Sequence, residues 1–425
     1  MNSILTKLVF LFLLSFVLIL LTDCNREIEQ QAPSSIIPSK EQLSGSRFAA
    51  FINDLKSLPE DQRKGFVQNF LSSNPSSPII EDSILACFYW FGSASLVLIN
   101  GDIHSGWSRP DIMKYISCGD EKFFFAVCTL PPDSRVDYQF VVDGKTITDP
   151  RNKVISPSGY GFNSQCTMPL FKPKNIREYR ANVKHGTIDS LWFMSKSTSI
   201  KPRMIKIYKP ADYDSLSEFP AVYLNDGFKA IEYCSFINLL DNLIAERKIM
   251  PIIAVFIDFA EGDSDYFLNK TDEYITALCD ELVPFIDSRY KTSTKNSNRL
   301  LTGISDGGHA SLHTALKRSD VFFNAAGQSS TITEKLFNAI DELSSSKNVH
   351  LYPKLYFDVG RYDLINGYKD NSFLYANQLF SQELNKAEIN YRFRIFNDGH
   401  QWANWRERMD EILIYFFGTL PEAHL

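Results

Sequence analysis

The chain has 425 residues, of which 44% are hydrophobic and 13% are aromatic. This length leaves room for two or three domains, and the apolar fraction is enough for a sizeable buried core. The 44 Lys and Arg residues and the 50 Asp and Glu residues give a net charge of -6. Because a nucleic-acid binder needs a basic stripe to meet the phosphates, no nucleic-acid partner is expected.

The first residues are predicted to be an export signal. Residues 8–21 are almost wholly apolar, a stretch too short for an ordinary membrane span of about 20 residues. The sequence LTDC at residues 21–24 resembles a bacterial lipobox, although Asp23 stands where such signals usually have a small residue. The resemblance implies a signal peptide over residues 1–24, acylation of Cys24, and a lipoprotein anchored to a membrane of the cell envelope, in the periplasm or at the cell surface. An uncleaved anchor and an ordinary signal peptide are the alternatives.

Residues 25–80 are predicted to be a linker with short helices. Residues 25–40 are polar and contain several Gln, Ser and Pro residues, as expected of a tether. Apolar residues then recur at helical spacing on either side of Pro59. These residues are Phe48, Phe51, Ile52, Leu55, Phe66, Phe70 and Leu71.

Residues 81–173 have the pattern of a small all-β domain. Short apolar runs at 95–99, 123–128 and 138–142 are separated by turn sequences such as Asn-Gly and Asp-Gly. The spacing predicts a sandwich. The sequences VLINGD at 97–102, YQFVVDG at 138–144 and DPRN at 149–152, together with Trp107, resemble the early-set domain of the isoamylase and glycogen-binding type. A sugar could stack on Trp107, but a core or interface position is the alternative.

Residues 174–425 change to alternating strands and helices. Apolar strands are predicted at 204–208, 220–224, 252–257, 300–302, 355–359 and 391–396. Helices are predicted at 275–286, with a kink at Pro284, and at 375–384 and 403–417. Buried strands that alternate with helices indicate an α/β fold with a mostly parallel sheet covered on both faces.

A nucleophile elbow is predicted at residues 303–308, which read GISDGG. This sequence follows a short apolar strand and precedes a helical run, which is the context that an elbow needs. Glycines on either side of the serine let the chain reverse and raise the hydroxyl above the sheet. Ser305 is therefore the candidate nucleophile.

The base and the acid are expected after the last two strands, in the chain order of α/β-hydrolases. His400 lies in the loop directly after the strand at 391–396, and it is the predicted base. Asp363 lies in the loop after the strand at 355–359 and is the predicted acid, with Asp358 and Asp370 as alternatives. His309 and His313 fall on the helix after Ser305.

Backbone donors must stabilise the oxyanion that forms during attack. The first is predicted to be the N–H of Asp306, which follows the nucleophile. The second is predicted in the loop after the strand at 220–224, where Gly227 permits a close approach and the N–H of Phe228 is the expected donor.

Several of these sequences resemble the enterochelin esterase and esterase D family, which is related to bacterial feruloyl esterases. The resemblance spans residues 185–418 and implies an α/β-hydrolase that cleaves carboxylic esters, with Ser305, Asp363 and His400 in the triad roles. Asp306 and Asn225 stand where the family more often has uncharged or apolar residues. The matching sequences are HG at 185–186, IYKP at 207–210, YLNDG at 223–227, ELVPFI at 281–286, the elbow, GRYD at 360–363, and DGHQW at 398–402 with WR at 405–406.

A serine esterase acting on a small-molecule, glycan or siderophore-type ester is therefore the favoured function. An acyltransferase of the mycolyltransferase type, or a surface lipoprotein that only binds, is the alternative. No CxxC or HExxH sequence is present, so neither a metal nor a cofactor is expected. Free or partly paired thiols are expected for the six cysteines after Cys24, which are Cys87, Cys118, Cys128, Cys166, Cys234 and Cys279.

Overall fold

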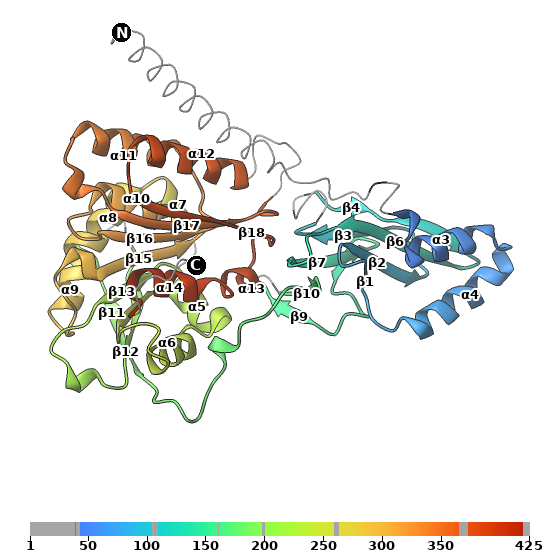
Figure 1. Cartoon of the computed structure of the whole chain (residues 1–425), viewed down its shortest axis with the longest axis horizontal. Helices are drawn as coiled ribbons and strands as arrows, with labels where there is room; N and C mark the ends of the chain where they lie inside the picture. The colour runs from blue at the N-terminus through green and yellow to red at the C-terminus, as the bar shows by residue number, and fades with distance from the viewer. Residues whose placement is uncertain are drawn as a thin grey trace, which may run out of the picture.

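A computed structural model of the chain describes residues 39, 43–103, 107, 109–159, 161–197, 200–258, 263–364 and 373–419. The predicted signal peptide, Cys24 and Asp370 lie outside these residues, so lipidation and membrane attachment stay predictions. Figure 1 shows a smaller β-sandwich body beside a larger α/β body. No helix within the described ranges is long and apolar enough to cross a membrane.

The smaller body contains two antiparallel sheets. The first has the order β1-β2-β6-β5 and the second has the order β4-β3-β7-β10-β9, with β8 paired to β7. Side chains between the two sheets, including Phe88 and Phe140, form a buried core. The strands are β1 Ile79–Glu81, β2 Leu85–Gly92, β3 Val97–Gly101, β4 Asp111–Ile112, β5 Lys114–Cys118, β6 Glu121–Thr129, β7 Arg135–Val142, β8 Lys145–Ile147, β9 Ile155–Pro157 and β10 Phe162–Thr167.

Two helices cover the outer face of the first sheet. They are α3, Arg47–Ser57, and α4, Glu60–Ser73, and their apolar faces share a buried cluster with Cys87 and Tyr89 of β2. Successive side chains of a strand point to opposite faces, so β2 is apolar throughout because both of its faces are covered. The helices therefore belong to the β-sandwich body and are not part of a free linker.

The larger body has an eight-stranded sheet of order β11-β12-β14-β13-β15-β16-β17-β18. The strands β11 and β12 are antiparallel to their neighbours, and the pairs from β14 to β18 are parallel. This arrangement confirms the α/β-hydrolase fold. The strands are β11 Thr187–Phe193, β12 Arg203–Lys209, β13 Ala221–Leu224, β14 Ile253–Ile257, β15 Arg299–Ile304, β16 Asn324–Gln328, β17 Lys354–Gly360 and β18 Tyr391–Phe396.

Helices cover both faces of this sheet. One face packs against α5, α6, α13 and α14, and the other packs against the helices from α7 to α12 (Figure 1). The helices are α5 Gly227–Cys234, α6 Phe236–Ala245, α7 Asp263–Leu268, α8 Thr271–Thr276, α9 Val283–Asp287, α10 Asp306–Lys317, α11 Glu334–Ser345, α12 Phe373–Lys386, α13 Trp402–Trp405 and α14 Met409–Phe417.

Two predicted helices differ in detail from the structure. The segment at 275–286 contains a π-helical stretch, Ala277–Leu282, before Pro284 enters the first turn of α9. The segment at 403–417 is broken into α13 and α14, and Arg408 lies at the break as the N-cap of α14. The break places the Arg408 side chain among buried carboxylates beside the site described below.

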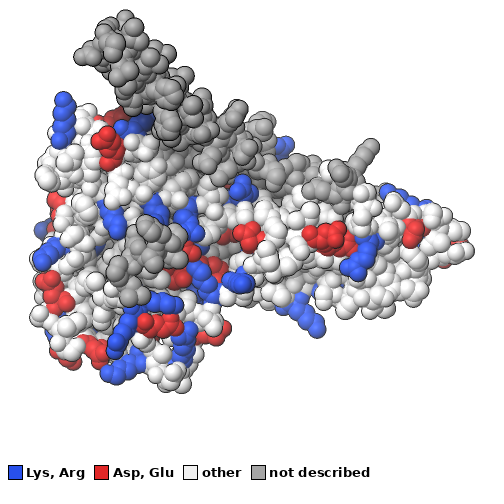
Figure 2. All heavy atoms as spheres, in the orientation of Figure 1, with Lys and Arg blue, Asp and Glu red and all other residues white. Residues whose placement is uncertain are grey.

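Charged side chains are spread over both bodies. Figure 2 shows Lys and Arg interspersed with Asp and Glu on the face in view, separated by uncharged side chains. On that face, the described residues form no continuous stripe of one sign.

Candidate active site

Ser305 lies at the sharp turn between β15 and α10. Its backbone has φ 54° and ψ -116°, a conformation that is strained for a residue with a side chain. A Cβ atom at Gly303 would lie 2.3 Å from the carbonyl oxygen of Gly307, so only glycine lets strand and helix approach this closely. The Ser305 N–H also donates to the Gln328 carbonyl of β16 at 2.9 Å. The sequence forms the predicted elbow, which aims the hydroxyl out of the sheet.

His400 follows β18 and faces this hydroxyl. Its Nε2 lies 3.1 Å from Ser305 Oγ. The rings of Phe373 and Trp405 meet the imidazole edge-on, at centroid distances of 5.0 and 4.8 Å. Trp405 is itself fixed because its indole N–H donates to Ser329 Oγ at 2.8 Å. The imidazole is therefore held at hydrogen-bond distance from the serine.

Asp363 lies behind the imidazole and is fully buried. Its Oδ1 is 3.4 Å from His400 Nδ1, which is ion-pair distance but longer than a good hydrogen bond. Contacts of this kind are often long in sites without substrate. Its Oδ2 accepts the Gly360 N–H at 2.9 Å, which fixes the carboxylate in its loop. The alternative Asp358 points instead to Arg408, 3.0 Å away.

Arg408 lies between two buried carboxylates, those of Asp358 and Asp398, near Asp363 and His400. Its guanidinium is 1% exposed and lies 3.0 Å from Asp358 and 3.5 Å from Asp398. Burial raises the pKa of each of these two carboxyl groups to about 7, against the opposing attraction of Arg408. Asp363 contributes to both shifts as a nearby like charge. Several carboxyl groups therefore lie close together beside the imidazole, and Arg408 offsets their repulsion, with Arg135 acting on Asp398 as well.

A cavity of about 250 Å³ opens above Ser305. Ser305, Asp306 and His400 line it, as does Asp226 at the turn after β13. The other lining residues are Ser158 and Gly159 of the β-sandwich body, with Lys229, Ile304, Gly307, Gln401, Trp402 and Trp405 of the hydrolase body.

Gly227 and Phe228 are the two further residues that the sequence predicts for the oxyanion hole. Gly227 begins α5, and a Cβ atom there would be 2.5 Å from the Phe256 backbone. The Phe228 ring lies under Lys206 Nζ, 4.2 Å from its centroid. Neither residue is among those that line the cavity, whereas the preceding Asp226 is. The donor roles of Phe228 and Gly227 stay predictions.

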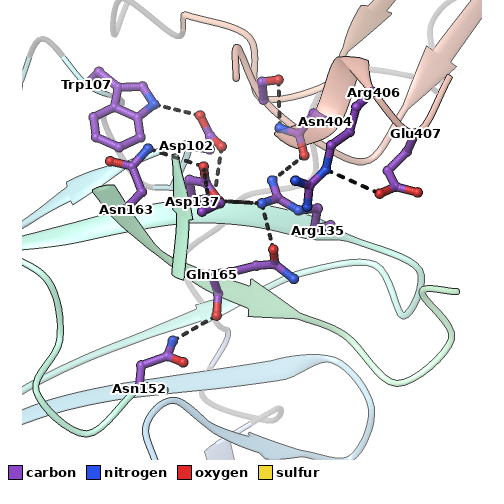
Figure 3. Close-up of polar contacts among 12 residues, drawn as sticks. Asp102, Trp107, Arg135, Asp137, Asn152, Asn163, Gln165, Asn404, Arg406 and Glu407 are labelled. Carbon is purple, nitrogen blue, oxygen red and sulfur yellow. Dashed lines mark hydrogen bonds and ion pairs between the residues drawn. The ribbon is translucent and has the colours of Figure 1, made fainter. Parts of the chain in front are cut away.

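The Asp306 side chain is bonded to a hydroxyl group. Thr331 Oγ1 donates to Asp306 Oδ1 at 2.6 Å. Two arginines could have neutralised this carboxylate, but both have other partners. Arg361 donates to Asn397, and Arg406 pairs with Glu407, as Figure 3 shows for the second pair.

Asn225 supports the elbow, a role that the sequence does not predict. Its amide donates to the Gly307 carbonyl at 3.1 Å and to Ser311 Oγ at 3.0 Å, and its oxygen accepts from the Tyr274 hydroxyl. The side chain therefore ties the first turn of α10 to the end of β13.

His309, His313 and Trp107 are not among the residues that line the cavity. Burial lowers the pKa of His309 to about 3 and that of His313 to about 4, so both are neutral core residues on α10. The Trp107 indole N–H donates to the buried Asp102 carboxylate at 2.6 Å. Glycan stacking on Trp107 stays a prediction.

Comparisons with known proteins agree with this fold. Residues 196–416, more than half of the chain, match the esterase family, whose description is "Putative esterase". The enterobactin esterase of Shigella flexneri superposes with a TM-score of 0.63 at 17% identity, over 80% of this chain and 94% of that one. The ferric enterobactin esterase of Salmonella typhimurium gives 0.66 at 16% identity, over 82% and 98%. At these identities the likeness is one of fold.

A segment of 200 residues is 30% identical to an endo-1,4-beta-xylanase/feruloyl esterase of Xylanibacter ruminicola. The match covers 44% of this chain but spans only about a quarter of that relative, 27% of its length. The sheet, the elbow and the cavity thus define an α/β-hydrolase. The chain belongs to the esterase family.

Proposed function

We propose that the protein is a serine carboxylic-ester hydrolase that acts through an acyl-enzyme. The main observation in support of this proposal is the distance of 3.1 Å between Ser305 Oγ and His400 Nε2, two residues that line an open cavity. Asp363, buried on the far side of the imidazole, is the acid in this proposal. It orients the ring and stabilises the imidazolium that forms during attack.

The proposed reaction has two balanced halves. His400 Nε2 takes the Ser305 proton while Oγ bonds to the ester carbonyl carbon, and the Asp306 N–H binds the oxyanion. Collapse breaks the bond to the alcohol oxygen, which leaves with the proton from His400. Water then repeats the sequence on the acyl-enzyme, and the carboxylic acid leaves while Ser305 regains its proton.

The cavity wall favours a small ester with an aromatic acyl group. Trp402 and Trp405 are the aromatic residues of the wall, and Lys229 brings a positive charge beside the carboxylates of Asp226 and Asp306. Among the similar proteins, one is named an enterobactin esterase and one an endo-1,4-beta-xylanase/feruloyl esterase. A feruloyl or catecholate-type ester is therefore the proposed substrate class.

Labelling with a fluorophosphonate tests the proposal directly. We expect one adduct per chain, which peptide mapping places on Ser305, together with hydrolysis of an aryl acetate that the label abolishes. Methyl esters of aromatic acids should be cleaved faster than those of aliphatic acids of equal size. Absence of both adduct and hydrolysis would contradict the enzyme, and an adduct elsewhere would contradict the site.

Replacing Asp306 tests how its charge is handled. At roughly 5 Å from the oxyanion and an effective dielectric near 20, an unopposed carboxylate would cost about 3 kcal/mol. Because Thr331 holds this carboxylate by a hydrogen bond of 2.6 Å, we expect Asp306→Asn to change kcat/KM on neutral aryl esters by less than about threefold. Thr331→Val should slow the reaction, and Asp306→Asn in that background should restore it. A large gain or loss for Asp306→Asn alone would show that the charge acts in the site.

A further inference from the structure

Both loops that carry the proposed acid and base rest on the β-sandwich body. Tyr362, one residue before Asp363, is 2% exposed and belongs to the sandwich core cluster, together with Leu130 and Val136. Its backbone N–H donates to the Asp398 carbonyl at 2.9 Å. The loop of the acid is thus anchored in one body and bonded to the loop of the base, although its strand belongs to the other body.

Arg135 makes the corresponding contact with the loop of His400. Its N–H donates to the Asn397 carbonyl at 3.1 Å, and its Nη1 donates to Asn404 Oδ1 at 2.6 Å. The Asn404 amide, next to Arg135 in Figure 3, donates in turn to the carbonyl of Gly399, the residue before His400, at 2.8 Å. A chain of two side-chain hydrogen bonds therefore joins β7 of the sandwich to the backbone beside the imidazole.

The Arg135 guanidinium is also held by residues of the sandwich itself. Its Nη2 lies 2.8 Å from Asp137 Oδ1 and donates to Gln165 Oε1 at 2.8 Å (Figure 3). Asp137 also accepts from Ser156 and Asn163. A buried charge held by several partners in one rotamer is a rigid support.

Gly399 is the second point of support. A Cβ atom there would lie 2.1 Å from Asp102 Cγ of the sandwich body, so the loop backbone packs directly against that carboxylate. Asp102 is held by the Trp107 indole N–H at 2.6 Å and by the Asp137 N–H at 2.9 Å. This explains why the residue before the histidine is glycine.

We propose that the β-sandwich body positions the acid and the base of the esterase, with Arg135 and Asn404 as positioning residues for His400. This inference rests on the proposed function of Ser305, Asp363 and His400. Displacement of a reacting group by about 1 Å can lower the rate about a hundredfold, so the contacts from the sandwich are expected to raise kcat. The sandwich then contributes to catalysis by holding these two residues in place, whether or not it binds a ligand.

The test uses the full chain with Asn404→Ala and Arg135→Lys. Each substitution removes a hydrogen bond between the sandwich and the loop of His400, and neither residue lines the cavity. We expect kcat on an aryl ester to fall about 10- to 100-fold with KM within about twofold of wild type. Hydrogen exchange of the backbone amides at 397–404 should accelerate, while exchange in β15 and α10 stays unchanged.

Asn152→Ala is the matched control. Asn152 donates to the Tyr138 hydroxyl and to the Gln165 carbonyl and accepts from the Val154 N–H, so its hydrogen bonds stay within the sandwich and do not cross the interface. It should lower the melting temperature about as much as Asn404→Ala but leave kcat and exchange at 397–404 unchanged. Asn404→Asp, which keeps the bond to Arg135 and loses the donor to Gly399, should resemble Asn404→Ala.

Two results would overturn the inference. One is unchanged exchange at 397–404 in Asn404→Ala and Arg135→Lys. The other is a rate loss that Asn152→Ala reproduces, since general destabilisation would then be sufficient. If the wild type hydrolyses no ester and takes up no fluorophosphonate, the proposed function fails, whereas the exchange measurement still decides whether the sandwich holds the loop.

Discussion

Ser305→Ala should lower kcat for aryl ester hydrolysis by at least about 10⁴-fold, and His400→Ala should do the same. The serine hydroxyl is the atom that forms the acyl-enzyme in the proposed reaction, and the imidazole 3.1 Å away is the group placed to take its proton. Because the two act as a unit, the double variant should be no slower than the slower single variant. Initial rates on an aryl acetate, with fluorophosphonate uptake measured in parallel, check these expectations.

His350 provides a control because it is exposed and is not among the residues that line the cavity. His350→Ala should keep full activity, and all three variants should melt close to the wild type because none removes a large buried apolar group. Activity that survives Ser305→Ala would contradict the proposed nucleophile. If that residual activity disappears with a chelator, the hydrolysis depends on a metal.

Asp363→Asn should preserve the fold and lower kcat by up to about 10⁴-fold. The carboxylate is fully buried, its Oδ2 is fixed by the Gly360 N–H, and its Oδ1 faces His400 Nδ1 at 3.4 Å. An amide can offer its NH₂ group to Nδ1, which favours the wrong imidazole tautomer and cannot stabilise an imidazolium. Steady-state rates together with near-UV circular dichroism separate lost chemistry from lost folding.

Asp358→Asn is the informative comparison for that variant. Asp358 pairs with Arg408 and does not face the imidazole, so its loss should affect the free energy of unfolding more than kcat. The assignment of the acid is wrong if Asp363→Asn is near wild type while Asp358→Asn is inactive.

The parts of the site that depend on local sequence were predictable. The elbow is set by glycines around Ser305, and the loops of Asp363 and His400 each follow a strand whose apolar run is plain in the sequence. The strand β16 was missed because its sequence, NAAGQ, is polar and small. All five of its residues are buried, and at Gly327 a Cβ atom would lie 2.2 Å from Ser330 Oγ and 3.1 Å from Leu312 Cδ1.

Contacts between distant segments could not be predicted. Arg135 and Asn404 are 269 positions apart, and neither belongs to a recognisable motif. The helical spacing in α3 and α4 was visible, but amphipathic helices do not reveal which surface they will cover. Their place on the sheet of β2 and β6 depends on that sheet having a second apolar face. Asn225 likewise has a role only because Gly307 and Tyr274 surround it.

The six described cysteines are all unpaired and buried, and burial raises the pKa of each thiol. Since the thiolate is the reactive form, alkylating reagents should reach them only when the surrounding structure opens. Four of these thiols, at Cys87, Cys118, Cys128 and Cys166, lie in the sandwich, and two, at Cys234 and Cys279, lie in the hydrolase body. The native chain therefore carries its own set of reporters, from which the opening rates of the two bodies can be timed separately without introducing a probe.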